Sequence, residues 1–142
     1  MKKADFAKLI INTYARIDSG WCQGVTVLKK NMLLGCSDAT RMVGTIDLLT
    51  HAIKFITVSG FPDELEDLKD LSLDPWTGRV WVSAQGNWFW SIDANTWTVR
   101  KEVPRPTQNF GIFVDRDKQG ILWSASQNRS RIEKISMAAV GS

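Results

Sequence analysis

Short runs of apolar residues alternate with polar turns along most of the chain, without the three-and-four spacing that a helix would need. The clearest feature is a repeat between residues 74–85, DPWTGRVWVSAQ, and residues 116–127, RDKQGILWSASQ. In each copy a polar turn with a glycine leads into a run that contains a tryptophan, and Trp81 and Trp123 are 42 positions apart (123 minus 81). The pattern therefore predicts β-strands arranged in a unit of about forty residues.

A weaker copy of this unit lies upstream, at residues 25–36. A third run follows the three copies, at residues 44–48, 89–93 and 131–135, and a fourth run follows the first two, at residues 52–58 and 97–103. Four short strands per unit, joined by Gly, Asn, Asp and Thr turns, are typical of a β-propeller blade. A β-sandwich would accommodate the same strands but gives no reason for the repeat. We therefore predict an all-β fold, a β-propeller of about three four-stranded blades over residues 21–142.

The motifs at residues 71–75, 78–82 and 92–96 carry a resemblance to a known group of folds. There the chain resembles six-bladed propellers of the NHL and gluconolactonase-like type. The resemblance covers residues 24–135, and its motifs are general to propellers. It implies a fold and no particular activity.

The number of blades carries a further expectation. Propellers close with four to eight blades, so three blades leave the outer faces of the first and the third uncovered. Such faces expose apolar side chains, which mark association surfaces. We expect this half-propeller to close to six blades by forming a homodimer. A fragment of a longer or split propeller is the alternative.

Residues 1–20 form a separate N-terminal segment in this prediction. Within it, residues 6–17 precede the first unit by about the gap that separates a fourth strand from the next blade, which predicts an outer closing strand. The same residues also fit an amphipathic helix, because Phe6, Leu9, Ile10 and Ile17 share a helical face. Both predictions leave the propeller open.

Charge and cysteine content restrict the partners and the compartment. The chain has 142 residues and a net charge of +3, with basic residues scattered, so nucleic acid is not expected as a partner. The N-terminal apolar stretch has neither a signal peptide's pattern nor the length of a membrane span. Cys22 and Cys36 form no CxxC motif, which argues against zinc and suggests a reduced, cytoplasmic setting or a virion.

The loops that face a propeller's channel entrance are, by the resemblance, the expected ligand site. The candidate ligand residues there are Gln85, Asn87, Trp88, Gln108, Asn109, Gln127, Asn128 and Arg129. Their amides suit sugars or peptide backbone, although amides and glycines are also simply good turn formers. Trp81, Trp90 and Trp123 are instead expected to pack between blades, because each ring buries a large area.

Few residues suggest catalysis. The single histidine, His51, falls in a predicted turn, and no nucleophile elbow is present. A lactonase-like metal site would need oxygen ligands at the channel, for which Asp18, Asp70 and Asn109 are placed. We expect no catalytic residue, metal or cofactor. The leading hypothesis is a non-catalytic binding or assembly module that presents its loop face to a glycan or protein. A metal-dependent lactonase-like hydrolase and a virion or other structural assembly protein are the alternatives.

Overall fold

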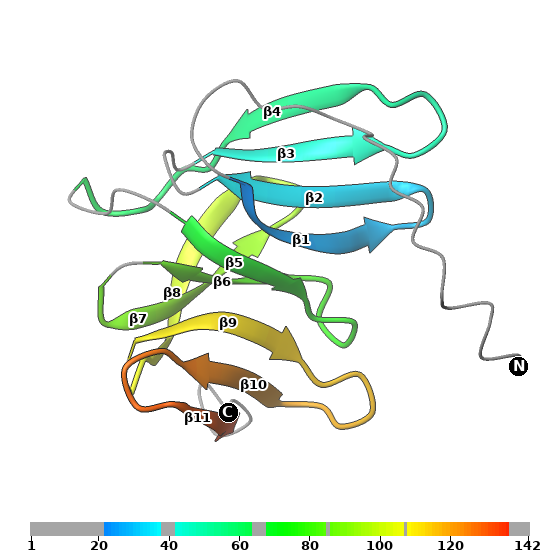
Figure 1. Ribbon diagram of the computed structural model, residues 1–142. Coiled ribbons are helices and arrows are strands. Elements are labelled where there is room, and N and C mark those ends of the chain that lie inside the picture. The colour runs from blue at the N-terminus through cyan, green and yellow to red at the C-terminus, as the bar shows by residue number, and fades with distance from the viewer. Residues whose placement is uncertain (1–21, 38–41, 64–67, 85, 107, 137–142) are drawn as a thin grey trace, which may run out of the picture.

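The computed structural model describes residues 22–37, 42–63, 68–84, 86–106 and 108–136 (Figure 1). These residues form eleven β-strands: β1 (Cys22–Lys29), β2 (Met32–Ser37), β3 (Met42–Asp47), β4 (Ile53–Thr57), β5 (Leu68–Leu73), β6 (Val80–Ala84), β7 (Trp88–Asp93), β8 (Thr98–Pro104), β9 (Asn109–Val114), β10 (Ile121–Ser126) and β11 (Arg131–Ser136). The predicted strand or helix at residues 6–17 lies outside the described residues. None of the described residues belongs to a helix with the length and hydropathy needed to cross a membrane.

The strands form three antiparallel sheets, each of which follows the chain order. The orders are β1-β2-β3-β4, β5-β6-β7-β8 and β11-β10-β9, and these sheets are called blades 1, 2 and 3 below. The all-β fold and the partial propeller are thereby confirmed. Within the described residues blade 3 has three strands, which agrees with a sequence in which a fourth run follows only the first two units. Closure to six blades by a second copy stays a prediction.

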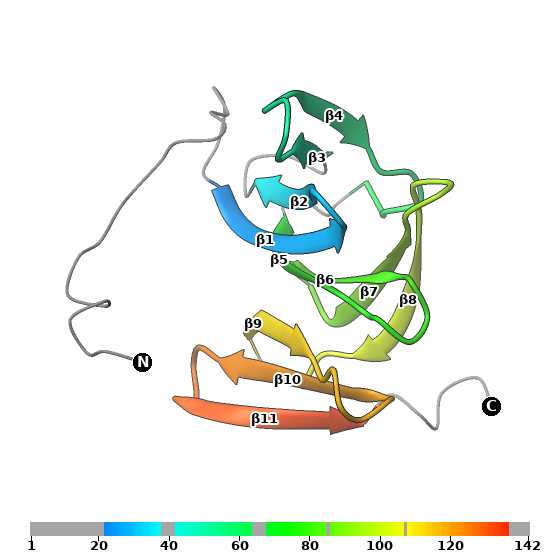
Figure 2. The same cartoon turned by 90° about the vertical axis from the view of Figure 1, so that its right-hand side faces the viewer.

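The blades pack face to face, with their first strands as neighbours. β5 contacts both β1 and β9 and lies between them in both views (Figures 1 and 2). Each first strand also contains a register shift near its start, between Cys22 and Gly24 in β1 and between Leu68 and Asp70 in β5. In β9 the shift lies between Asn109 and Gly111, which pair with Ser126 and Ala125 of β10. Such bulges bend the first strand in all three blades.

Two apolar clusters fill the joints between blades, and each takes residues from two facing sheets. In the joint between blades 1 and 2, the buried residues include Leu34, Cys36 and Val43 of blade 1 and Leu71, Val82 and Trp90 of blade 2. In the joint between blades 2 and 3, they are Trp81, Phe89 and Val103 of blade 2 and Ile112, Val114 and Leu122 of blade 3. Trp81 and Trp90 therefore take the packing positions that the sequence predicts for them.

The turn before each repeated tryptophan is built on one aspartate. Asp74 Oδ2 accepts a hydrogen bond from Trp81 Nε1 at 3.3 Å, and Asp115 Oδ2 accepts one from Trp123 Nε1 at 2.9 Å. Oδ1 of each aspartate accepts two backbone N–H groups of its own turn. The structural equivalent of Asp74 is thus Asp115, and not Arg116 as the sequence alignment places it, because the second turn is one residue longer.

Candidate functional site

The outer face of blade 3 exposes a cluster of large apolar side chains. Phe113 of β9, Trp123 of β10 and Ile132 of β11 share this face. Trp123 pairs with Phe113, and Ala125, two residues further along β10 and so on the same face, pairs with Ile132. Between 37% and 72% of each of the three residues is exposed. We call Phe113, Trp123 and Ile132 the blade 3 flank.

The outer face of blade 1 is the opposite end of the stack, and it is apolar too. Val25, Gly35, Gly44 and Phe55 pair in sequence across its four strands, and Val27 lies two residues from Val25 on the same face. About half or more of Val25, Val27 and Phe55 is exposed. We call these five residues the blade 1 flank.

Most of the exposed large hydrophobic residues in the described part of the chain belong to these two flanks. Eight large hydrophobic residues are exposed there in total, and six of them belong to the flanks. The other two, Leu49 and Trp76, lie in turns. Because a contiguous apolar patch on a folded domain marks an interaction site or an aggregation liability, the flanks are the main candidate functional surfaces.

The internal repeat measures what an absent neighbour does to a flank. Trp81 and Trp123 occupy equivalent positions and make the same indole-to-aspartate hydrogen bond. Trp81 is 6% exposed because blade 3 covers it, whereas Trp123 is 37% exposed. The sequence predicts inter-blade packing for Trp123, and within the described residues no further blade lies against it.

Side-chain oxygens of one blade also bind the first strand of the next. Thr26 Oγ1 accepts a hydrogen bond from Leu73 N at 3.1 Å, and Ser72 Oγ accepts one from Val114 N at 3.0 Å. Thr26 and Ser72 are equivalent positions in β1 and β5. The equivalent position in β9 is Phe113, whose ring cannot accept such a bond. The blade 3 flank therefore differs chemically from the two joints inside the chain.

Asp70 adds a second link between blades 2 and 3. Its Oδ2 accepts from Ile112 N at 2.9 Å and its Oδ1 from Leu71 N at 2.8 Å. Burial raises the pKa of Asp70, and the two backbone hydrogen bonds oppose that rise. Asp70 borders two shallow hollows. One of about 330 Å³ lies across β1, β5 and β9, and one of about 320 Å³ lies against Phe113 and Trp123 of the blade 3 flank.

The predicted ligand residues that the structure describes lie at the end of the blades where β6–β7, β8–β9 and β10–β11 connect, and we call this end the loop face. Backbone hydrogen bonds join Arg105 N to Asn87 O at 2.8 Å and Gln127 N to Gln108 O at 2.9 Å. Trp88 is partly buried, and Lys101 Nζ lies 5.1 Å from a ring centroid of its indole. Their role in ligand binding stays a prediction.

The remaining predicted ligand residues are placed differently from one another. Asn109 is fully buried, and its Nδ2 donates to Glu133 Oε1 at 3.2 Å. Asn128 Oδ1 accepts from Ser126 Oγ at 3.2 Å, and Arg129 is exposed. Gln85 lies outside the described residues.

Arg105 is a loop-face residue that no sequence motif indicates. Its Nη1 donates to Ala84 O at 2.7 Å, and its guanidinium carbon lies 5.1 Å from the Phe110 ring centroid. Burial lowers the pKa of Arg105. The side chain thereby ties the β8–β9 loop to the end of β6, which orients Asn87 through its bond to Arg105 N.

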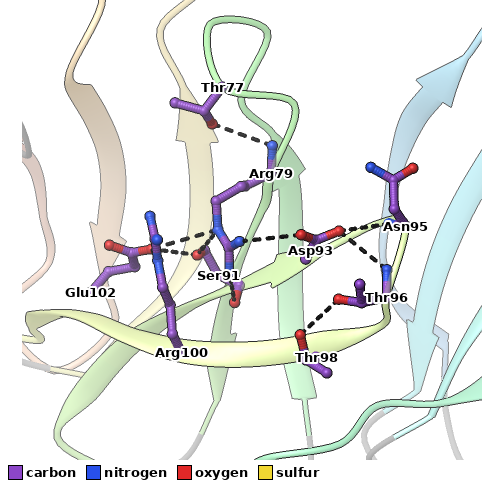
Figure 3. A network of polar contacts seen from close by, with 9 residues as sticks. All are labelled: Thr77, Arg79, Ser91, Asp93, Asn95, Thr96, Thr98, Arg100 and Glu102. Carbon is purple, nitrogen blue, oxygen red and sulfur yellow. Dashed lines mark hydrogen bonds and ion pairs between the residues drawn. The ribbon is translucent and has the colours of Figure 1, made fainter.

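A separate polar network lies on blade 2 (Figure 3). Arg79 Nε donates to Ser91 Oγ at 2.6 Å, Ser91 Oγ donates to Glu102 Oε1, and Arg100 Nε contacts the same oxygen at 2.5 Å. Arg79 Nη1 also lies 3.8 Å from Asp93 Oδ2. Burial, followed by the nearby Arg100, lowers the pKa of Arg79. Because all these partners belong to blade 2, the network ties the turn before β6 to β7 and β8.

Within the described part of the chain, no three His, Cys, Asp or Glu side chains gather in a way that could hold a metal ion. Asp70 and Asn109, two of the three predicted metal ligands, make the hydrogen bonds given above, and Asp18 lies outside the described residues. His51 is exposed in the β3–β4 turn with a φ of 63°.

No protein-family model and no curated protein sequence matches this chain. Solved structures that share its fold include a chain of a nidogen–laminin complex, with a TM-score of 0.70 and 15% identity over 88% of this chain and 48% of that chain. Hydrazine synthase from Kuenenia stuttgartiensis has a TM-score of 0.65 and 14% identity over 93% of this chain and 37% of that chain. The extracellular domain of a putative hybrid two-component system, BT3049 from B. thetaiotaomicron, has a TM-score of 0.61 and 13% identity over 87% of this chain and 18% of that chain.

At these identities the likeness establishes a β-propeller-like fold alone. The chain spans less than half the length of each of these three chains. The more specific resemblance to NHL and gluconolactonase-like propellers stays a prediction.

Proposed function

We propose that this chain is a binding or assembly module that acts as half of a closed β-propeller, in which a second copy covers both flanks. The supporting observation is the pair Trp81 and Trp123, which occupy equivalent positions and make the same indole-to-aspartate hydrogen bond. Blade 3 covers Trp81, whereas no described blade lies against the more exposed Trp123. Two copies supply six blades, which lies within the four to eight of closed propellers. The loop face of the ring then meets a glycan or protein partner.

The geometry of the proposed contact is head to tail. The blade 3 flank of one copy meets the blade 1 flank of the other, because inside the chain the two equivalent faces also meet each other. Such a heterologous contact forms a closed ring if the rotation between copies closes and a filament if it does not. Three blades in each copy fit closure with two copies.

The test of this function is the solution mass by light scattering over a range of concentrations. We expect a dimer that Val25→Lys on one flank and Ile132→Lys on the other both convert to a monomer, because each places a charge in an apolar contact. Leu49→Lys is the matched control, since Leu49 is 74% exposed and lies in a turn away from both flanks. A wild type that is well folded and monomeric at every concentration contradicts the proposal.

A second measurement separates this module from the lactonase-like alternative. Adding calcium should not change the melting temperature of a binding module, whereas calcium binding at a resident metal site would raise it. Binding of a glycan or protein to the loop face without any metal dependence is the expected result.

A further inference from the structure

We infer that Phe113 and Trp123 of one copy pack over Gly35 of the other copy, between Val25 and Phe55. This inference deepens the proposed function, on which it rests, by naming the residues that fit together across the contact. The contact commits to a second copy of this chain as the occupant of both flanks.

The first argument is the distribution of aromatic rings in the joints inside the chain. In each joint, the aromatic rings on the facing strands come from one blade only. Trp81 and Phe89 of blade 2 pack against aliphatic residues of blade 3. Trp90 of blade 2 packs against Leu34, Cys36 and Val43 of blade 1. Inside the chain an aromatic face is therefore matched by an aliphatic one. In the contact between copies the blade 1 flank adds one ring, Phe55, on its last strand, and has the small residue Gly35 at its centre.

The second argument is the shape of the blade 1 flank. Leu34 and Cys36 point into the joint with blade 2 and are almost fully buried, so Gly35 between them faces the flank. The equivalent positions in blades 2 and 3 are Val82 and Ser124, by their pairing in the sheets. Blade 1 thus has the smallest residue of the three at the centre of this face.

Gly35 has open space above it on the blade 1 flank. A Cβ atom placed on Gly35 would meet only Gly24 O, at 3.5 Å, within the described residues. Gly44 beside it is covered, because Phe55 ring carbons lie 3.8 Å from where its Cβ would be. Val25 on β1 and Phe55 on β4 therefore lie on either side of Gly35, above which the space is open.

The blade 3 flank has the complementary shape. Phe113 stands where Thr26 and Ser72 carry small hydroxyl side chains in the other first strands, so this flank has an aromatic ring at a position where blade 2 has a serine. Phe113 and Trp123 pair directly across β9 and β10. The proposed contact therefore places the ring pair of one flank over the central glycine of the other.

The chemistry of this contact also differs from that of the internal joints. Thr26 and Ser72 bind backbone N–H groups of the following blade, and Phe113 cannot. The contact between copies is consequently held by apolar burial without that hydrogen bond. A contact of this kind responds little to salt, since screening acts on charged groups.

The experiment uses the full chain and measures the dimer dissociation constant by analytical ultracentrifugation. Gly35→Val fills the space above Gly35 that we assign to the partner's rings. Because this overpacks the contact, we expect the dissociation constant to rise by about tenfold or more. The fold should tolerate the substitution, because the Cβ makes only an ordinary contact. Lys54→Val is the matched control, since Lys54 is an exposed residue of β4 next to Phe55 and points to the other face of blade 1.

A double-mutant cycle tests the pairing itself. In the Gly35→Val background, Trp123→Ala removes the ring that would clash, and we therefore expect it to weaken the dimer far less than the roughly 30-fold that it costs in the wild type. Circular dichroism checks that each variant is folded, and Gly35→Ala replaces Gly35→Val if the latter unfolds.

The possible outcomes separate the two proposals. A wild-type dimer whose dissociation constant is unchanged by both Gly35→Val and Gly35→Ala overturns this inference and leaves the proposed function standing. A wild type that stays monomeric overturns both. Equal losses of affinity for Trp123→Ala in the wild-type and Gly35→Val backgrounds overturn the assignment of Trp123 to the space above Gly35.

Discussion

The equivalent tryptophans provide a quantitative test of whether a partner covers the blade 3 flank. Trp81→Ala removes a ring that is 6% exposed in the joint between blades 2 and 3, and Trp123→Ala removes one that is 37% exposed. Both rings make an indole-to-aspartate hydrogen bond, so that contribution largely cancels in the comparison. The difference between the variants therefore measures burial by a neighbouring blade.

The magnitude follows from the exposed surface. The two tryptophans differ by roughly a third of a side chain that presents about 250 Å², which corresponds to roughly 80 Å². At about 25 cal/mol per Å², covering that surface stabilises the assembly by about 2 kcal/mol for each contact between copies. Such a free energy corresponds to about 30-fold in the dissociation constant. Trp81→Ala should lower the free energy of unfolding by about 3–5 kcal/mol, as for other buried aromatic residues.

The assay is guanidinium unfolding followed by far-UV circular dichroism at two protein concentrations, one below and one above the association range. Trp81→Ala should lose the same free energy of unfolding at both, because blade 3 of the same chain covers Trp81. Trp123→Ala should lose about 2 kcal/mol more at the higher concentration than at the lower. If the loss for Trp123→Ala is the same at both concentrations, no partner covers the ring and the reasoning is refuted.

Three further predictions follow from the joints and turns. Ser72→Ala should lower the free energy of unfolding by about 1–3 kcal/mol, because it leaves the buried Val114 N–H without its acceptor, whereas the exposed Ser136→Ala should change it by less than about 0.5 kcal/mol in the same denaturation assay. Gly24→Ala should lower it by about 1–3 kcal/mol, because its Cβ would lie 2.9 Å from Asp70 Cα, and an unchanged midpoint would contradict the close approach of β1 and β5. Hydrogen bonds from the Trp123 indole and from two backbone N–H groups lower the pKa of Asp115 below 3.8, so its contribution to stability is present at neutral pH and is lost as the pH falls through the lowered pKa. In melting curves recorded against pH, Asp115→Asn should therefore flatten the loss of stability in acid. Burial raises the pKa of Asp70, so its contribution has the opposite sign: it is full below 3.8 and is lost as the pH rises through the raised pKa.

The repeat could be predicted because strand periodicity and turn residues are local signals. Trp81 and Trp123 lie at matched positions of β6 and β10, and residues such as Gly78 and Gly120 adopt positive φ in the turns before them. The alignment failed at Asp115, because a turn with one more residue shifts the register without changing the strands on either side. Turn length is thus where a repeat found from spacing loses its accuracy.

The position of Asn109 shows a second limit of sequence patterns. Its place at the start of a strand predicts an exposed loop-face amide, yet it is fully buried. The register shift in β9 puts Asn109 on the buried face together with Ile112 and Val114, although an unbroken strand would place it on the opposite one. A bulge is one extra residue, and a period of two gives no sign of it.

The inter-blade hydrogen bonds could not be predicted for a different reason. Thr26 and Ser72 are ordinary strand residues, and only the packing of one blade on the next shows that their hydroxyl groups reach Leu73 N and Val114 N. Once that role is known, the third copy of the position becomes informative. Phe113 replaces a hydrogen-bonding group by a large apolar ring on the one blade whose outer face no described strand covers.

The presence of Phe113 at this position indicates that the blade 3 flank is a contact surface. A face left over from an incomplete ring would be expected to keep the residues of the internal joints or to become polar, because solvent would be its only neighbour. At Phe113 the change goes the other way, toward more exposed apolar surface, and it is accompanied by glycine at the matching centre of blade 1. The larger residue, Phe113, and the smaller residue, Gly35, lie on faces that do not touch within one chain. A contact with a second copy brings these two faces together and so explains both changes.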